Sequence, residues 1–194
     1  DENETANIIG TNEDYAQVRN YDIWQGSFLN GVSVDSGLRT VVIGSETATN
    51  LGITASDVGS DISIGGIPFQ LVGILQAKGT SGASSNDDIV LAPITAVQHY
   101  FNDTDSVSSI AMSVATAEQM DAVKASATAL LRERHNIASG GTDDFSVADQ
   151  AQLLESVDSI SSLLTILLAG IASISLVVGG IGIMNIMLVS VRER

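Results

Sequence analysis

Apolar residues are distributed unevenly along the chain, and the longest apolar run lies near its end. From Leu163 to Val191 the sequence reads LLTILLAGIASISLVVGGIGIMNIMLVSV, without a charged residue. As a helix this run would be roughly 40 Å long, which exceeds the ~30 Å hydrocarbon core of a bilayer. The alternative is a buried core helix, but nothing else in the chain is long or apolar enough to surround such a rod. The pattern therefore predicts a membrane-spanning helix over 163–191.

The charges on either side of this run predict its orientation. Arg192 and Arg194 follow it, whereas Asp149, Glu155 and Asp158 precede it with no lysine or arginine nearby. Basic flanks stay in the cytoplasm. We therefore expect the chain in the cell membrane (inner or plasma membrane). Residues 1 to about 160 would be extracytoplasmic, and 192–194 would begin a cytoplasmic region.

A helical pattern begins before the predicted span. Ser146 and Asp149 fit a capping box, with Ser146 at the N-cap and Asp149 at N3. One apolar stripe then continues into the span through Leu153, Val157, Ile160 and Leu164. The pattern predicts a stalk helix over 146–162 that is continuous with the span. A single rod of this kind would transmit movement between the outside domain and the cytoplasm.

The predicted span also carries a stripe of small residues. Its members recur at spacings of three, four and three on one narrow face: Ala172, Ser175, Gly179 and Gly182. Small side chains let helices approach closely in lipid, although glycine is also simply frequent in membrane helices. We favour a helix-packing role. The string Gly179-Gly180-Ile181-Gly182 is not a nucleotide-binding loop, because no strand precedes it and its surroundings are apolar.

Shorter periodic segments alternate upstream of the stalk. Alternation and short apolar runs predict strands over 40–44, 61–64, 67–76, 89–92 and 107–114. Capping signals and helical spacing predict helices over 13–19, 45–51, 93–101 and 116–135. This interleaving is typical of an α+β domain, which we place at 1–145, with the strand-rich stretch 40–77 as an inserted sub-domain.

Large aromatic side chains and loop composition complete this outline. Trp24 and Phe28 are expected to anchor the core. The Gly/Ser-rich stretch 77–88 predicts an exposed loop.

Charge and composition narrow the classes of function. The formal net charge is −15, from 23 acidic and 8 basic residues, and such a field repels phosphate backbones, so nucleic acid is excluded as a partner. Cysteine is absent, which leaves no disulfide framework or thiol chemistry. The acidic start Asp1-Glu2-Asn3-Glu4 does not resemble a secretory signal. We therefore expect an upstream segment to direct export, and the sequence to be a fragment.

A search for catalytic, cofactor-binding or metal-ligating residues yields none. His99 and His135 are the two imidazoles, and neither is accompanied by a nucleophile and an acid at a catalytic spacing. The acidic pairs Asp87-Asp88, Asp103/Asp105 and Asp143-Asp144 lack the ligand spacing of a calcium loop. We interpret them as solvated loop charges. No glycine-rich loop precedes a Lys-Ser/Thr pair, so we expect no ATP site in this chain.

The run from Leu176 to Arg194, LVVGGIGIMNIMLVSVRER, resembles the second transmembrane helix of MacB-type ABC transporter permeases, a branch of the FtsX-like group. Further segments similar to this family follow its order along the chain: Asp14-Tyr15, Val18-Arg19-Asn20, Gly26-Ser27-Phe28, Val41 to Ser45, Ile67-Pro68-Phe69, Val72 to Leu75, Lys78-Gly79, Leu131-Arg132, Arg134-His135 and Asp143-Asp144-Phe145. The resemblance covers nearly the whole chain. The family's first transmembrane helix would lie upstream, and two further helices would lie downstream.

The resemblance implies a permease segment without enzymatic activity of its own. ATP and Mg²⁺ would be held by an ABC ATPase subunit or domain, and cytoplasmic hydrolysis would move the extracytoplasmic domain for export or extrusion of a substrate. Implied partners are a second permease copy in a homodimer or pseudo-symmetric dimer, an extracytoplasmic adaptor and membrane lipid. Two other classes compete with this interpretation. A sensor with one signalling helix would carry a cytoplasmic signalling module after Arg194, and a membrane-anchored hydrolase would need a nucleophile and base that the sequence does not offer.

Overall fold

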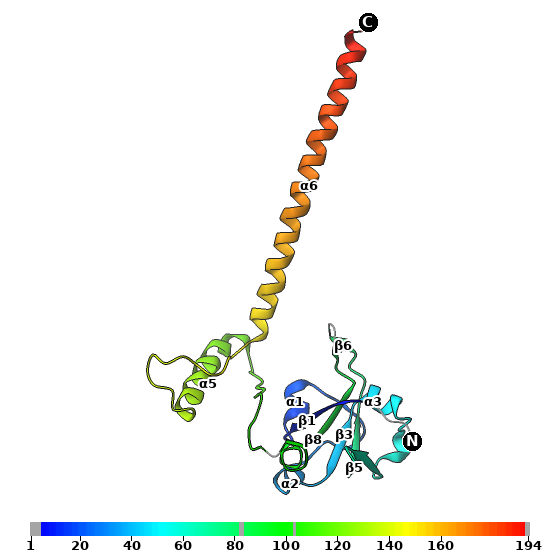
Figure 1. Ribbon diagram of the computed structural model, residues 1–194, viewed down its shortest axis with the longest axis vertical. Coiled ribbons are helices and arrows are strands. Elements are labelled where there is room, and N and C mark those ends of the chain that lie inside the picture. Colours follow the sequence, from blue (N-terminus) through cyan, green and yellow to red (C-terminus); the bar gives the residue numbers. More distant parts are fainter. Residues whose placement is uncertain (1–4, 82–83, 103, 193–194) are drawn as a thin grey trace. The chain divides into compact units, whose positions relative to one another are not determined.

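The computed structural model describes residues 5–81, 84–102 and 104–192, which form two compact units, Asp1–Ser113 and Val114–Arg194. The first unit holds the strands. The second contains α5 (Met120–Arg134) and α6 (Gln150–Arg192) (Figure 1). The predicted α+β class is confirmed. The boundary falls between Ser113 and Val114, so the domain that we expected over 1–145 spans the first unit and the beginning of the second.

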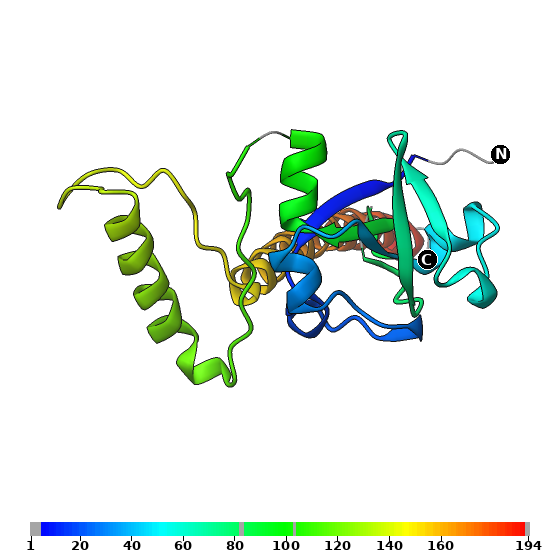
Figure 2. The ribbon, with the colours of Figure 1, turned by 90° about the horizontal axis from the view of Figure 1, so that it is seen from below.

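Six strands form one mixed sheet in the first unit (Figure 1 and Figure 2). Its order is β1 (Asn7–Thr11), β8 (Ile89–Pro93), β3 (Thr40–Ile43), β5 (Ile67–Leu75) and β2 (Ile23–Gly26), with β4 (Asp61–Ile64) paired to the first half of β5. Two pairs are parallel, β1 with β8 and β3 with β5, and the others are antiparallel. The strands of 40–77 thus share a sheet with β1, β2 and β8 and form no separate sub-domain, because β3 pairs with β8 and β5 pairs with β2.

The sheet has an apolar cluster on each of its faces. Neighbouring residues of β3 divide between them: Val41 and Ile43 belong to one cluster and Val42 to the other, as the period of two in a strand requires. Phe69 is fully buried in the first cluster, where Phe101 stacks at 6.0 Å and Tyr100 meets it edge-on at 6.2 Å. These contacts attach the helical segment after β8 to the sheet.

The hairpin of β4 and β5 confirms the clearest local signal in the sequence. Gly65 and Gly66, between the two strands, both have positive φ angles, +59° and +84°. A two-residue loop of this type requires positive φ at both positions, which glycine adopts without steric cost. Glycine-glycine between two alternating runs therefore predicted this element correctly.

Short helices cover the sheet near the positions that the sequence predicts. They are α1 (Tyr15–Arg19), α3 (Ser45–Asn50) and α4 (Ile94–Val97), the last continuing as a π-helical turn over Gln98–Asn102. An additional helix, α2 (Gly31–Asp35), was missed. Its signal is a capping box in which the Asn30 side chain accepts from the backbone N–H of Ser33, and the Ser33 hydroxyl accepts from the backbone N–H of Asn30.

The prediction that Trp24 anchors the core is wrong, whereas Phe28 does pack against the second cluster. The Trp24 side chain is 58% exposed. It lies in β2, where the register with β5 shifts between Ile23 and Gln25. An extra residue at such a bulge is turned away from the regular alternation of the strand. The bulge depends on pairing with β5 and has no local sequence signal.

The segment 107–114 was predicted as a strand, and that prediction is also wrong. In the part of the chain that the structure describes, it pairs with no strand, and Val107, Ile110 and Met112 are more than half exposed. Alternation of apolar and polar residues shows only that the side chains of a segment suit a sheet. A strand also needs a neighbour for its backbone N–H and C=O groups, and none of the described strands provides one.

The described residues of the Gly/Ser-rich stretch 77–88 include short strands, which the loop prediction missed. They are β6 (Thr80–Ser81) and β7 (Ser84–Ser85). Asp87, expected to be solvated, is only 8% exposed, and its carboxylate accepts hydrogen bonds from the backbone N–H groups of Lys78 at 2.8 Å and Gly79 at 2.7 Å. Its carbonyl oxygen accepts from the N–H of Glu46 at the start of α3. Asp87 therefore ties the base of the stretch to the start of α3.

We predict that Asp87→Ala lowers the free energy of unfolding by about 1–3 kcal/mol, because two backbone donors lose a largely buried acceptor. Urea denaturation followed by intrinsic fluorescence measures this effect. Asp35→Ala is the control, since Asp35 is exposed at the end of α2. Equal unfolding midpoints for Asp87→Ala and the control would show that the carboxylate does not stabilise the fold.

Candidate functional site: the long helix and its junction

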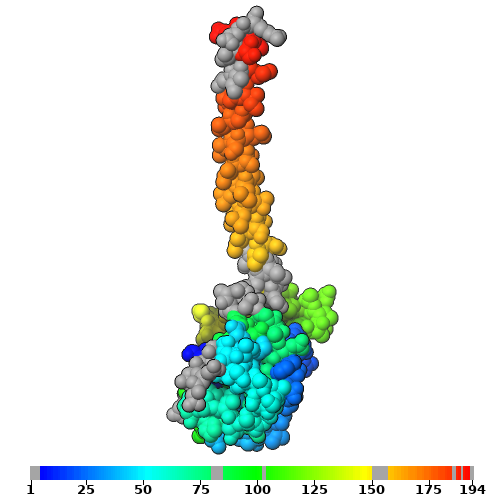
Figure 3. All heavy atoms as spheres, turned by 90° about the vertical axis from the view of Figure 1, so that its right-hand side faces the viewer, coloured from blue at the N-terminus to red at the C-terminus, as the bar shows by residue number. Residues whose placement is uncertain are grey.

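The second unit ends in α6, a single helix of 43 residues. At 1.5 Å per residue it is about 65 Å long (Figure 1 and Figure 3). Within it, Val157–Met184 has a mean hydropathy of 2.4 and is long and apolar enough to cross a membrane, by length and composition. None of that window is buried, so α6 is not a core helix of the described chain. The long apolar helix that the sequence predicts is confirmed.

The predicted start of this helix is wrong by four residues. α6 begins at Gln150, so Ser146 lies outside the helix and Asp149 directly precedes it. Ser146 therefore does not cap α6, and Asp149 is not at N3. The Asp149 carboxylate instead lies 3.1 Å from Nζ of Lys124 on α5, a partner that local sequence reasoning does not find. Leu153 and Glu155, which were also named in the sequence analysis, belong to the residues whose side chains the structure does not describe.

The predicted small-residue stripe lies on an uninterrupted part of α6. Ala172, Ser175, Gly179 and Gly182 are all exposed. A Cβ atom added to Gly179 or Gly182 would meet nothing within 4 Å. The helix continues through Gly179-Gly180 without a break. The face is thus available to another helix, and its packing role stays a prediction.

The segment between α5 and α6 is fastened to α5 by charged groups. Besides the ion pair of Lys124 with Asp149, Arg132 pairs with Asp143 and donates to the carbonyl oxygens of Ala138 at 3.0 Å and Gly141 at 3.1 Å. We call this segment, residues 136–149, the connector. Asp143 was expected to be a solvated loop charge, and the structure gives it this guanidinium partner instead.

His135, the C-cap residue of α5, forms a further contact with the connector. Its Nδ1 lies 2.8 Å from Oδ1 of Asp144, and its ring meets Phe145 edge-on at 5.7 Å. The hydrogen bond with His135 lowers the pKa of Asp144 below its usual value. A lowered folded-state pKa stabilises the fold above the ordinary aspartate pKa, and this contribution is lost as the pH falls through the lowered value. Asp144 is therefore also paired.

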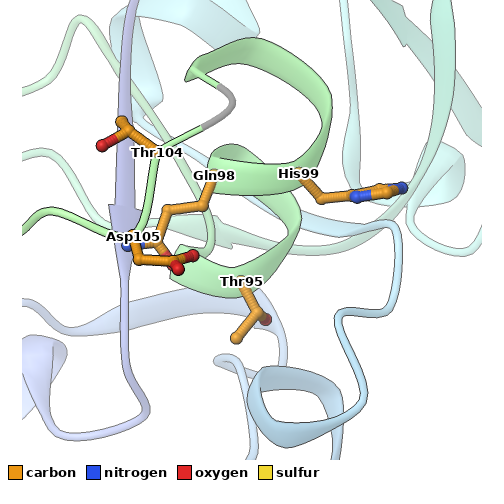
Figure 4. A pocket seen from close by; sticks show the side chains of 5 residues that line it. All are labelled: Thr95, Gln98, His99, Thr104 and Asp105. Atoms are coloured by element: carbon orange, nitrogen blue, oxygen red, sulfur yellow. The ribbon is translucent and has the colours of Figure 1, made fainter.

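His99, the other imidazole, lies beside a shallow polar hollow of about 320 Å³. The hollow is lined by Thr95, Gln98, His99, Thr104 and Asp105 (Figure 4). The His99 side chain points away from Asp105 and Gln98 and lies against the Tyr100 ring at 4.7 Å. The side chains do not converge on a common point, so the hollow offers no acid–base pair.

Metal-ligating groups do not gather either. Among the described residues no three side chains of His, Cys, Asp or Glu come together in a way that could hold a metal ion. Asp103, one of the acidic residues considered above, lies outside the described residues. The features that remain as functional candidates are α6 and its junction with α5.

Comparison with known proteins identifies the family to which this chain is similar. A family described as "MacB-like periplasmic core domain" matches residues 1–130. The chain belongs to this family. The "Macrolide export ATP-binding/permease protein MacB" of Hyphomonas neptunium is 40% identical over 192 residues, covering 98% of this chain and 29% of that protein. The "Pyoverdine export ATP-binding/permease protein PvdT" of Pseudomonas entomophila is 33% identical over 189 residues, covering 96% of this chain and 28% of that protein.

The fold is also similar to that of a solved member of the MacB family. The crystal structure of the periplasmic region of MacB from Actinobacillus actinomycetemcomitans matches with a TM-score of 0.60 and 20% sequence identity. The match covers 80% of this chain and 67% of that one. At this identity the likeness concerns the fold alone. The chain spans less than a third of the length of its MacB and PvdT relatives.

The MacB-like segments that belong to the second unit lie in two places. Arg132, His135, Asp143, Asp144 and Phe145 come together at the junction of α5 and α6. The string from Gly179 to Val191 lies within α6. Neither place contains a catalytic arrangement among the described residues.

We predict that Gly179→Leu combined with Gly182→Leu weakens helix association without preventing insertion, because the longer side chains hold helix backbones apart. In-membrane cross-linking of the complete protein measures association, and resistance to carbonate extraction measures insertion. Val177→Leu combined with Met184→Leu is the control, since both residues lie on the opposite side of the helix from the stripe. Unchanged cross-linking in the glycine variant would remove the packing role.

Proposed function

We propose that this chain is the extracytoplasmic domain, stalk and one membrane helix of the permease of a MacB-type ABC exporter. The observation that carries the proposal is the continuity of α6. One uninterrupted helix of 43 residues joins an apolar, fully exposed stretch to the junction with α5. A continuous helix is stiff, so a displacement at one end is delivered to the other.

In this proposal the chain couples ATP hydrolysis to movement but does not hydrolyse ATP. The relatives are named ATP-binding/permease proteins, and this chain matches less than a third of each. ATP and Mg²⁺ would be bound by an ABC ATPase domain or subunit on the cytoplasmic side. The described residues provide exposed surfaces and one long helix, which suits a chain that moves while another domain or subunit hydrolyses ATP. No cofactor is assigned to the chain itself.

The cargo and the other partners are proposed at the level of class. One relative is named for macrolide export and another for pyoverdine export. We propose export of a substrate, with the permease acting as a homodimer or pseudo-symmetric dimer in membrane lipid and with an extracytoplasmic adaptor as a further partner. The exposed stripe around Gly179 and Gly182 supports a helix–helix contact within such a dimer.

The orientation proposed for α6 follows from its flanks. Arg192 ends the helix, and Asp158 lies near its other end. Basic residues are retained in the cytoplasm, so the C-terminal end would be cytoplasmic and both the strand-bearing unit and α5 would be outside.

We expect a cysteine at position 109 to react with a membrane-impermeant maleimide in intact spheroplasts, and a cysteine at position 194 to react only after lysis. Ser109 is exposed, and the natural chain has no cysteine, so Ser109→Cys and Arg194→Cys each carry a single reporter in this segment. Cysteines elsewhere in the complete transporter are replaced first. Labelling of position 194 before lysis would reverse the orientation.

A second prediction concerns α6 itself. Ser159→Pro should interrupt α6 ahead of the predicted span, because proline removes a helical hydrogen bond and clashes with the preceding turn. The complete transporter is spin-labelled at position 109 through Ser109→Cys. ATP should then no longer change the distance between the labels of two copies, while ATPase activity is retained.

Ser159→Ala is the matched control and should keep the ATP-driven distance change. If the unmutated helix gave no distance change with ATP, the exporter proposal would fail. If Ser159→Pro left the change intact, movement would not pass through α6.

A further inference from the structure

The contacts between the connector and α5 follow each other in order along both segments. The connector leaves the C-terminal end of α5 at His135 and pairs with Arg132 and His135 through Asp143 and Asp144. It then reaches Lys124 through Asp149, immediately before α6 begins. Lys124 lies eight positions before Arg132, about 12 Å along a helix. The connector therefore runs back along α5, as its trace in Figure 1 and Figure 2 also shows.

Partly buried side chains occur in both the connector and α5. Residues 145, 147 and 149 of the connector are half-buried, while 146 and 148 are exposed. Such alternation is that of an extended segment with every second side chain turned toward a surface. The half-buried positions of α5 recur at helical spacing on one face: Met120, Val123, Lys124, Ala127, Thr128, Leu131 and Arg132.

Basic residues are scarce in this chain. The chain has 8 Lys and Arg residues and two histidines against 23 acidic residues. Lys124, Arg132 and His135 are all engaged with the connector. The Lys124–Asp149 pair is the least solvated of the three, with side chains 28% and 11% exposed. Pairs shielded in this way resist opening more than exposed ones, because separation leaves a poorly solvated charge without its partner.

We propose that α5, the connector and the first turn of α6 form a rigid joint that stays closed while α6 moves. The joint makes α5 the first element to receive a displacement of the stalk. Without these pairs, a connector that has no helix or strand of its own would act as a flexible linker and would absorb the movement. This inference rests on the proposed exporter function, because it assumes that α6 moves.

The test uses the absence of cysteine from this chain. In the complete transporter with other cysteines replaced, Lys124→Cys with Asp149→Cys is treated with a short bifunctional methanethiosulfonate. Ser126→Cys with Asp149→Cys is the matched control, since position 126 is exposed and lies about 200° around α5 from position 124. We expect cross-linking of the first pair only, with yields in the nucleotide-free and ATP-trapped states that agree within about twofold.

ATPase activity is the second readout of this test. Cross-linking of positions 124 and 149 should leave the ATPase rate unchanged. A yield that falls severalfold in the ATP-trapped state would overturn the proposal, and so would an ATPase rate that collapses on cross-linking and recovers on reduction. Either result would make the junction a hinge that opens during the cycle.

A charge-exchange series tests the joint without cysteine at the junction. Lys124→Glu should abolish the ATP-driven distance change between labels at position 109, and Lys124→Glu with Asp149→Lys should restore at least half of it. Restoration is a result that a simple folding defect of the single variant does not produce. A normal distance change in Lys124→Glu, or a well-folded exchanged pair that restores nothing, would overturn the proposal. Failure of the exporter function is distinguishable, because the unmodified transporter would then show no ATP-driven change at all.

Discussion

The apolar surface of α6 is the constraint on which the rest of this protein depends. A helix about 65 Å long with exposed apolar side chains over Val157–Met184 is strongly unfavourable in water, because each buried methylene group is worth about 0.8 kcal/mol. In hydrocarbon the same helix satisfies its backbone internally and needs no further protein cover. Length and composition make this stretch a candidate to cross a membrane, whereas the remainder of the chain is polar and acidic.

The attachment of that rod is made by electrostatics as well as by packing. The connector contains Asp143, Asp144 and Asp149, and each is paired with a basic group at α5. In a chain of net charge −15, unpaired acidic side chains would repel one another and favour an open connector. The few basic residues placed on α5 therefore determine that the connector follows the helix. The strand-bearing unit uses a carboxylate similarly, since Asp87 closes the base of 77–88 through backbone donors.

Local sequence patterns predicted correctly those features that depend on residues close together in the chain. The β4–β5 hairpin, the buried strand β3 and the long apolar helix follow from glycine conformation, from apolar runs and from the absence of charge. Features that depend on distant partners were missed or misassigned. Trp24 is turned outward by a bulge against β5, and 107–114 has a strand pattern without a described strand beside it. Ser146 and Asp149 matched a capping box, but Asp149 is engaged with Lys124, twenty-five positions earlier.

The sequence by itself determined the long apolar helix, the α+β class and the resemblance to MacB-type permeases, because hydropathy, short-range periodicity and local strings are all properties of neighbouring residues. Only the tertiary structure decided that one sheet unites β1, β2 and β8 with the central strands. It also decided that the stalk begins at Gln150 and that the acidic residues of the connector are paired on α5. Those outcomes arise from contacts between residues far apart in the chain, and a local pattern contains no information about which distant group will occupy the other side of the contact.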